Sequence, residues 1–158
     1  MTTSGQSSSV SALWSKTING RPAVGAVAER TRRTCMRDVE MFSEMTGDRN
    51  PLHYNTELAA KSPFRRLIVQ GGVTSGLLNA IVAEDLPGPG TVFLQVEWRF
   101  VKAVAIGDEI VGQVEVISVR DDKPICALRT VVRDLRGDAY LSGTAITYTV
   151  PLKSEAAT

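Results

Sequence analysis

The chain has 158 residues, 43% of them hydrophobic, and a domain of this size buries enough apolar surface to fold without disulfides or metal ions. Cys35 and Cys126 have no partner at disulfide-scaffold or zinc-site spacing, so we expect two free thiols, no metal and no cofactor. A net charge of +1 argues against nucleic acid as the main partner, because phosphate binding needs an excess of Lys and Arg. The single histidine, His53, excludes any mechanism that requires two imidazoles.

Neither end of the chain carries a recognisable targeting or membrane segment. The serine-rich start has no basic region and no apolar run, and no segment approaches the ~20 apolar residues of a membrane helix. We therefore expect a cytoplasmic protein with no membrane association. Residues 1–20 are predicted to form a flexible tail, residues 21–152 a single domain, and residues 153–158 a short C-terminal tail.

The first half of the domain is predicted to be mainly helical, after one candidate strand over residues 24–33. Apolar spacing predicts a helix over 34–47, which a glycine ends. Asn55 is a suitable cap for a short helix over 56–61. Residues 71–83 form a third predicted helix, and because it carries no charge, we expect it to be buried on nearly all sides.

In the second half, the apolar pattern changes to a period of two after the Pro-Gly-Pro-Gly breaker at 87–90. Residues 91–100 predict a strand with one buried face. Further strands are predicted over 109–119, 125–132 and 139–150, and the short turns between them favour antiparallel neighbours. The fold class is therefore α+β, a long antiparallel sheet around one apolar helix. Exposed strand edges in such a sheet favour at least a dimer.

The residues that carry chemistry lie in the loop after the first helix. Asp48 follows the helix-ending glycine, and Pro51 restricts Asn50 to extended or turn conformations. Such a loop holds the Asp48 carboxylate and the His53 imidazole in a fixed relation, and these two groups are the minimum for acid–base work on one water. Each residue also has a purely structural alternative, Asp48 as a turn or capping carboxylate and His53 as a hydrogen-bonded loop histidine.

Two glycines, Gly71 and Gly72, open the apolar helix. The first amides of a helix are unpaired and lie at its positive end, so they suit an oxygen that gains negative charge. The alternative is a tight entry that serves packing alone. Arg65 and Arg66 precede these glycines; by default they are solvated, but they could also meet the phosphates of a large anionic ligand.

Residues 46–53, Thr-Gly-Asp-Arg-Asn-Pro-Leu-His, resemble the hydratase motif of the MaoC-like dehydratases and (R)-specific enoyl-CoA hydratases, Gly-Asp-x-Asn-Pro-Leu-His. Residues 64–71 are similar to the family's lead-in to its central helix, and the resemblance covers about residues 22–150. It implies a hot-dog fold, a curved antiparallel sheet around a central helix, usually paired into a dimer. Gln70 and Gly72 depart from the family, which commonly has His and a larger residue at these positions.

The resemblance implies a reaction and a role for each residue. Asp48 and His53 would activate one water for reversible syn addition to a trans-2-enoyl thioester, giving the (R)-3-hydroxyacyl product. The backbone N–H of Gly71, at the Gly-Gly helix entry, would bind the thioester oxygen. Asn50 and Pro51 would position the loop.

The acyl carrier remains open at this point, because coenzyme A and acyl carrier protein share the phosphopantetheine arm. A basic rim built from Arg65, Arg66 and Lys102 would suit either CoA phosphates or an acidic carrier protein. A hot-dog thioesterase would need a carboxylate on the central helix, which residues 71–83 lack. A non-catalytic partner subunit would be expected to lack the Asp–His pair that this chain has.

Overall fold

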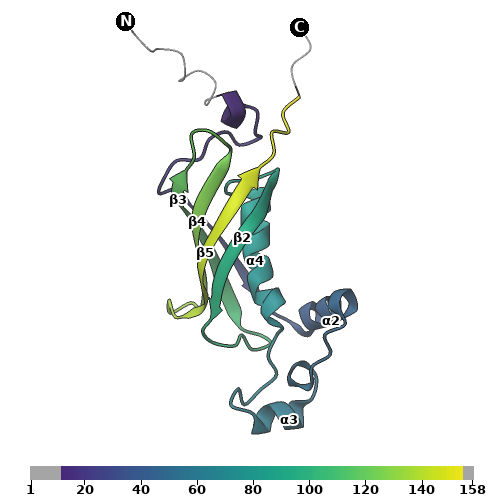
Figure 1. The fold of residues 1–158 in the computed structure, drawn as a ribbon. Helices are drawn as coiled ribbons and strands as arrows, with labels where there is room; N and C mark the ends of the chain where they lie inside the picture. The colour runs from purple at the N-terminus through teal and green to yellow at the C-terminus, as the bar shows by residue number, and fades with distance from the viewer. Residues whose placement is uncertain (1–11, 155–158) are drawn as a thin grey trace, which may run out of the picture.

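The computed structural model describes residues 12–154, in which five strands form one antiparallel sheet and helix α4 packs against all five strands (Figure 1). This arrangement confirms the predicted sheet wrapped around one apolar helix. Residues 1–11 and 155–158, parts of the two predicted tails, lie outside the described residues. Residues 12–20 of the predicted N-terminal tail are described, and Trp14 among them is 1% exposed and belongs to the core. Within 12–154, no helix is long and apolar enough to cross a membrane.

The three predicted helices begin and end close to their predicted positions, as α2 (Met36–Thr46), α3 (Thr56–Lys61) and α4 (Gly71–Glu84). The loop predicted after α2 also contains a 3₁₀ turn that was not predicted, η1 (Pro51–His53). At the start of α2 the N–H of Cys35 donates to Asp38 Oδ2 at 2.8 Å, and α2 ends at Gly47, whose φ of 83° is left-handed. Asn55 caps α3 as predicted, because its Oδ1 accepts from the N–H of Leu58 at 3.0 Å.

The strand order differs from the sequence-based expectation at one place. The strands are β1 (Val27–Arg33), β2 (Thr91–Phe100), β3 (Glu109–Val119), β4 (Ile125–Arg133) and β5 (Ala139–Thr149), in the order β1-β3-β4-β5-β2. The prediction that β2 and β3 are neighbours is wrong, because β2 pairs with β5 at the edge of the sheet. After β2, the chain does not turn back to pair with it. The connection to β3 instead forms a hydrogen bond with the segment before α4, where the N–H of Val69 donates to Val104 O at 2.9 Å.

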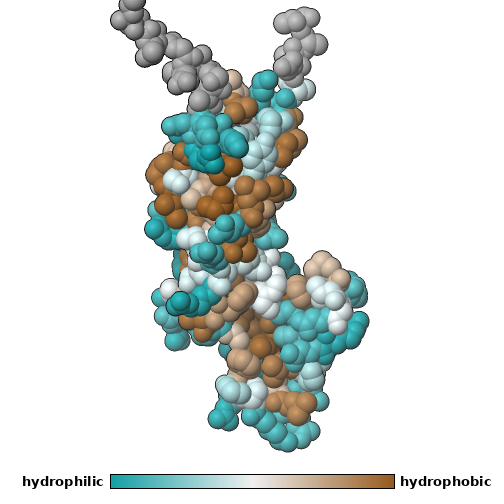
Figure 2. Space-filling view, viewed as in Figure 1, coloured by the Kyte–Doolittle hydropathy of each residue, from teal (hydrophilic) through white to brown (hydrophobic). Residues whose placement is uncertain are grey.

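The predicted burial of one face of β2 is also wrong. Four of its apolar side chains are between 41% and 57% exposed: Val92, Leu94, Val96 and Phe100. A register irregularity between Phe93 and Gln95 interrupts the alternation. Among the apolar side chains of β2, only Phe93 and Trp98 pack against the core, and their rings meet edge to face with centroids 5.7 Å apart. An edge strand of a single chain therefore presents apolar side chains to solvent, and Figure 2 shows apolar surface gathered over the strands.

Helix α4 is buried along one side rather than on nearly all sides. Leu78 and Ile81 are fully buried against the sheet, whereas Asn79 is exposed, which corrects the expectation. Helix α4 lies close to the sheet at Gly112 of β3, where a Cβ would lie 3.0 Å from side-chain atoms of Leu77 and Ile81. Because Gly112 has no side chain, the helix can pack directly against the backbone of β3.

Both cysteines are free thiols, as predicted. Cys126 belongs to the core, where burial raises the pKa of its thiol to about 12. Cys35 is exposed in front of α2.

We predict that Gly143→Ala destabilises the fold by about 3 kcal/mol, the upper part of the range for overpacked sites. A Cβ at Gly143 would lie 1.9 Å from the carbonyl oxygen of Glu97 on β2, so the β2–β5 pairing must shift to accept it. Urea unfolding at fixed protein concentration measures the loss. The exposed neighbour gives the control Thr144→Ala, which should cost less than about 1 kcal/mol; equal effects of the two changes would contradict the steric argument.

Candidate active site

The predicted catalytic pair lies on the segment between α2 and α3, which extends beyond the end of the sheet (Figure 1). In Figure 1, α2, α3 and the loop between them gather near the N-terminal end of α4. Asp48 follows the end of α2, and His53 is the last residue of η1. The fold therefore brings the loop with both predicted side chains to the helix end that carries Gly71.

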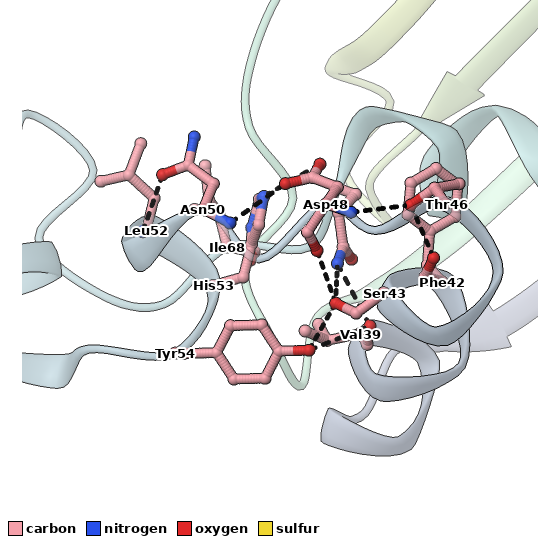
Figure 3. Close-up of polar contacts among 11 residues, drawn as sticks. Val39, Phe42, Ser43, Thr46, Asp48, Asn50, Leu52, His53, Tyr54 and Ile68 are labelled. Carbon is pink, nitrogen blue, oxygen red and sulfur yellow. Dashed lines mark hydrogen bonds and ion pairs between the residues drawn. The ribbon is translucent and has the colours of Figure 1, made fainter.

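The Asp48 carboxylate is oriented by its own loop. Its Oδ1 accepts from the N–H of Asn50 at 3.1 Å, and its N–H donates to Thr46 Oγ1 at 3.1 Å. Asn50 repeats the pattern, since its Oδ1 accepts from the N–H of Leu52 at 3.1 Å. Oδ1 therefore has the structural role predicted as the alternative, because it stabilises the turn. The side chain is 41% exposed, and its other oxygen, Oδ2, is directed towards His53 (Figure 3).

The His53 imidazole is nearly buried, with 7% of its side chain exposed. Its Nδ1 lies 2.7 Å from the carbonyl oxygen of Ile68. A carbonyl only accepts, so the proton of the neutral ring is assigned to Nδ1 and the lone pair to Nε2. Nε2 lies 3.8 Å from Asp48 Oδ2, too long for a hydrogen bond. Two acceptor atoms therefore face each other at a distance that one small hydrogen-bond donor can bridge.

A buried hydroxyl that the sequence reasoning missed lies behind this pair. Ser43 Oγ donates to the carbonyl oxygen of Asp48 at 2.6 Å and accepts from Gln70 Nε2 at 3.2 Å and from the Tyr54 hydroxyl. The only signal in the sequence was the position of Ser43, one turn after Val39 on the apolar face of the helix. In the sequence, Gln70 stands out only as a departure from the family pattern.

The two glycines at the start of α4 have different surroundings. Within residues 12–154 the N–H of Gly71 has no hydrogen-bond acceptor, as expected for the first turn of a helix, and a Cβ there would lie 3.0 Å from the Phe100 ring. At Gly72 a Cβ would lie 2.2 Å from the ring of Phe42 on α2. The N–H of Gly72 likewise has no acceptor among the described residues. Both amides are therefore open donors, and Gly72 is in addition required for packing.

Two cavities border α4. One, of about 560 Å³, contains Gly71 and is lined mainly by apolar side chains; its other residues are Pro63, Phe64, Ile68, Val69, Thr74, Phe100, Val101, Lys102, Ala103 and Val104. The other, of about 520 Å³, contains Gly72 and lies between α2, α4 and β1. Asp48 and His53 line neither cavity in the single chain.

The three basic residues proposed as a rim differ in their pairing. Arg66 contacts Asp108 at 3.3 Å and Lys102 contacts Asp134 at 3.0 Å. Arg65 makes no ion pair within the described part of the chain and has a left-handed φ of 66°. Carboxylates thus already compensate two of the three cations. Among the described residues no group of three His, Cys, Asp or Glu side chains could hold a metal ion.

Comparisons with known proteins identify the family and the fold. The family profile described as "MaoC like domain" matches residues 19–134. An (R)-specific enoyl-CoA hydratase of Aeromonas caviae is 34% identical over 123 residues, 78% of this chain and 92% of that protein. A mitochondrial 3-hydroxyacyl-[acyl-carrier-protein] dehydratase of Arabidopsis thaliana is 35% identical over 115 residues, 73% of this chain and 66% of that protein. The solved (R)-hydratase from A. caviae involved in PHA biosynthesis superimposes with a TM-score of 0.77 at 33% identity, covering 81% of this chain and 97% of that chain.

A curved antiparallel sheet around one apolar helix is the hot-dog fold, which this chain shares with the solved (R)-hydratase from A. caviae. The chain belongs to the MaoC-like dehydratase family. The family, the hot-dog fold and the hydratase or dehydratase class expected from the motif at residues 46–53 are therefore confirmed.

The contact between His53 and Ile68 predicts the tautomer of the only histidine. In the neutral ring, we expect the proton on Nδ1 and none on Nε2, because the Ile68 carbonyl must receive a donor. A long-range ¹H–¹⁵N spectrum of uniformly labelled protein shows one imidazole, so the assignment needs no variant. An Nε2–H pattern in the folded protein would contradict the assignment, and the unfolded protein provides the reference.

Proposed function

We propose that this chain catalyses the reversible hydration of trans-2-enoyl-CoA thioesters to (R)-3-hydroxyacyl-CoA, with Asp48 and His53 as the catalytic pair. One observation carries the proposal: His53 Nε2 and Asp48 Oδ2 face each other 3.8 Å apart. Their loop lies next to the N-terminus of α4, where the first backbone amides have no acceptor. Thioesterase chemistry has less support, because α4 has no carboxylate before Glu84 at its last position.

In the hydration direction, one water donates a hydrogen bond to each of the two acceptor atoms, His53 Nε2 and Asp48 Oδ2. Its oxygen attacks C3 of the enoyl thioester while one of the pair removes a proton. The double-bond electrons move towards the thioester oxygen, and the N–H of Gly71 stabilises the negative charge that gathers there. A proton returned by the pair to C2, on the face that the water attacked, completes syn addition.

The carrier is proposed to be coenzyme A, with acyl carrier protein as the alternative. The cavity beside Gly71 is walled by Phe64, Phe100 and Val101, which suits the pantetheine arm shared by both carriers. Arg65 makes no ion pair within the described residues and is therefore the cation most available to a phosphate. Arg66 and Lys102 would each have to break an ion pair with a carboxylate before binding a phosphate. The sequence relatives include proteins named for each carrier.

We expect Asp48→Asn and His53→Ala each to lower kcat for crotonyl-CoA hydration at least 100-fold, as for the loss of an acid–base group. Loss of absorbance of the conjugated thioester follows the reaction, and thiol release measured in parallel reports thioesterase activity. The control is Asp121→Asn, which alters only an exposed carboxylate paired with Arg21.

Near wild-type hydration by either variant would refute the catalytic pair. Wild-type protein that hydrates crotonyl-acyl carrier protein but no enoyl-CoA would replace the proposed carrier by the alternative. Thiol release without hydration would instead indicate a thioesterase.

A homodimer formed through β2 is the assembly that we propose. β2 is the last strand of the sheet, so its outer backbone edge is unpaired within the described residues, and Val92, Leu94 and Val96 are exposed along it. An unpaired apolar edge is a template for another strand, and pairing with β2 of a second copy would cover both edges at once by two-fold symmetry.

The double change Leu94→Glu with Val96→Glu is expected to convert the dimer into a monomer at micromolar concentration, because two-fold symmetry brings four carboxylates into one interface. Light scattering coupled to size-exclusion chromatography gives the mass. Ile117→Glu, on β3 and 38% exposed, is the control and should remain dimeric. Monomeric wild-type protein, or a double variant that stays dimeric, would contradict assembly through β2.

A further inference from the structure

Ser43 is the centre of a buried polar junction behind the proposed catalytic pair. Its Oγ donates one hydrogen bond, to the carbonyl oxygen of Asp48, and accepts two, from Tyr54 and Gln70. A serine hydroxyl has one proton and two lone pairs, so every hydrogen-bonding position of this group is used. Ser43 and Gln70 are 1% and 2% exposed, and in such surroundings hydrogen bonds are strong and directional.

The junction connects segments that the sheet does not hold together. Ser43 belongs to α2, Asp48 to the following loop, Tyr54 directly follows His53, and Gln70 is the residue before Gly71. Figure 3 shows Ser43 between the Tyr54 hydroxyl and the backbone of Asp48. One hydroxyl therefore fixes the loop that presents the acid–base pair relative to the helix end that presents the open amide.

The orientation of Gln70 supports a specific role. Its Nε2 donates to both Val39 O and Ser43 Oγ, at 3.1 and 3.2 Å, while its Oε1 is buried without a partner in the described residues. A flipped amide would place an acceptor against the Val39 carbonyl. The amide group leaves its own oxygen unsatisfied, which costs stability, while its NH₂ ties α4 to α2.

We propose that Ser43, with Tyr54 and Gln70, is the positioning centre that sets the catalytic pair against the thioester-binding end of α4. The proposal rests on the proposed function, because it assumes that Asp48 with His53 and Gly71 act on the two ends of one enoyl thioester. These residues touch no substrate. They keep the attacking water and the oxygen-binding amide at the separation that the reacting atoms require, where a shift of 1 Å can cost 100-fold in rate.

The test uses Ser43→Ala, Tyr54→Phe and the double variant, assayed with crotonyl-CoA. Each single change is expected to lower kcat about 10-fold with KM changed less than twofold, because binding contacts remain and alignment is lost. The double variant is expected to match the worse single variant, since both changes break one junction. Additive losses in kcat, or losses confined to KM, would overturn the proposal.

The matched control is Thr149→Val, which removes a buried hydroxyl that lies 2.9 Å from Thr91 Oγ1. It breaks a hydrogen bond of the same kind away from the α2–α4 junction, so kcat should stay within twofold of wild type. A fall in kcat equal to that of Ser43→Ala would show that any buried hydroxyl acts through stability alone, and would overturn the positioning role.

Hydrogen exchange followed by mass spectrometry separates this proposal from the proposed function. In Ser43→Ala, amides of residues 48–54 and 71–74 should exchange about 10-fold faster, while those of β4 and β5 stay at wild-type rates, since local opening is reported segment by segment. Unchanged exchange in both segments would overturn the junction whatever the assay shows. If wild-type protein hydrates no thioester, the proposed function fails, and the exchange result alone decides whether Ser43 couples the two segments.

Discussion

The His53 ring is held by one hydrogen bond, from Nδ1 to the carbonyl oxygen of Ile68 at 2.7 Å, and the rest of the site depends on it. The bond assigns the proton to Nδ1, so the lone pair of Nε2 is directed towards Asp48. Ile68 belongs to the segment that leads into α4 and forms an isolated bridge with Ala105. The ring is thereby fixed to the chain that positions Gly71, and not only to its own loop.

The scaffold and the site follow different physical rules. Helix α4 is fixed by apolar packing against the sheet, where Leu78 and Ile81 are fully buried and Gly112 permits close approach. Packing of this kind is dense and resists displacement. The segment with Asp48 and His53 lies outside the sheet, and polar contacts such as those of Ser43 hold it in place. A rigid helix end is therefore combined with a loop whose position is set by directional hydrogen bonds.

Local patterns were sufficient to predict the elements, but not their neighbours. Gly47 and Asn55 mark helix ends through backbone chemistry that the sequence displays directly. The pairing of β2 with β5 could not be read in this way, because it joins residues about 50 positions apart, and a period of two carries no information about which strand lies alongside. The burial of β2 was misjudged for the same reason, since an alternating pattern does not show whether its apolar face meets the core or another chain.

The candidate site divides in a similar way. Asp48 and His53 were predictable, because a proline-stiffened loop with a carboxylate and the only imidazole is a local signal. The Ser43 junction was not, because a serine on an apolar helix face becomes meaningful only when Tyr54 and Gln70 arrive from other parts of the chain. Gly71 and Gly72 look alike in sequence, and only the structure shows that the ring of Phe42 leaves no room for a side chain at Gly72.

The open surface of the single chain and the chemistry of the site point in the same direction. The Asp48 side chain is 41% exposed. The cavity beside Gly71 reaches Phe100, the exposed last residue of β2, and Val101, which follows it. Acid–base and oxyanion contacts gain strength when water is excluded, which this chain alone does not achieve. Pairing through β2, proposed above on the exposed apolar edge, would bring a second chain next to this cavity. The same contact would then cover the strand edge and lower the dielectric around the reacting thioester, so assembly and catalysis would depend on one surface.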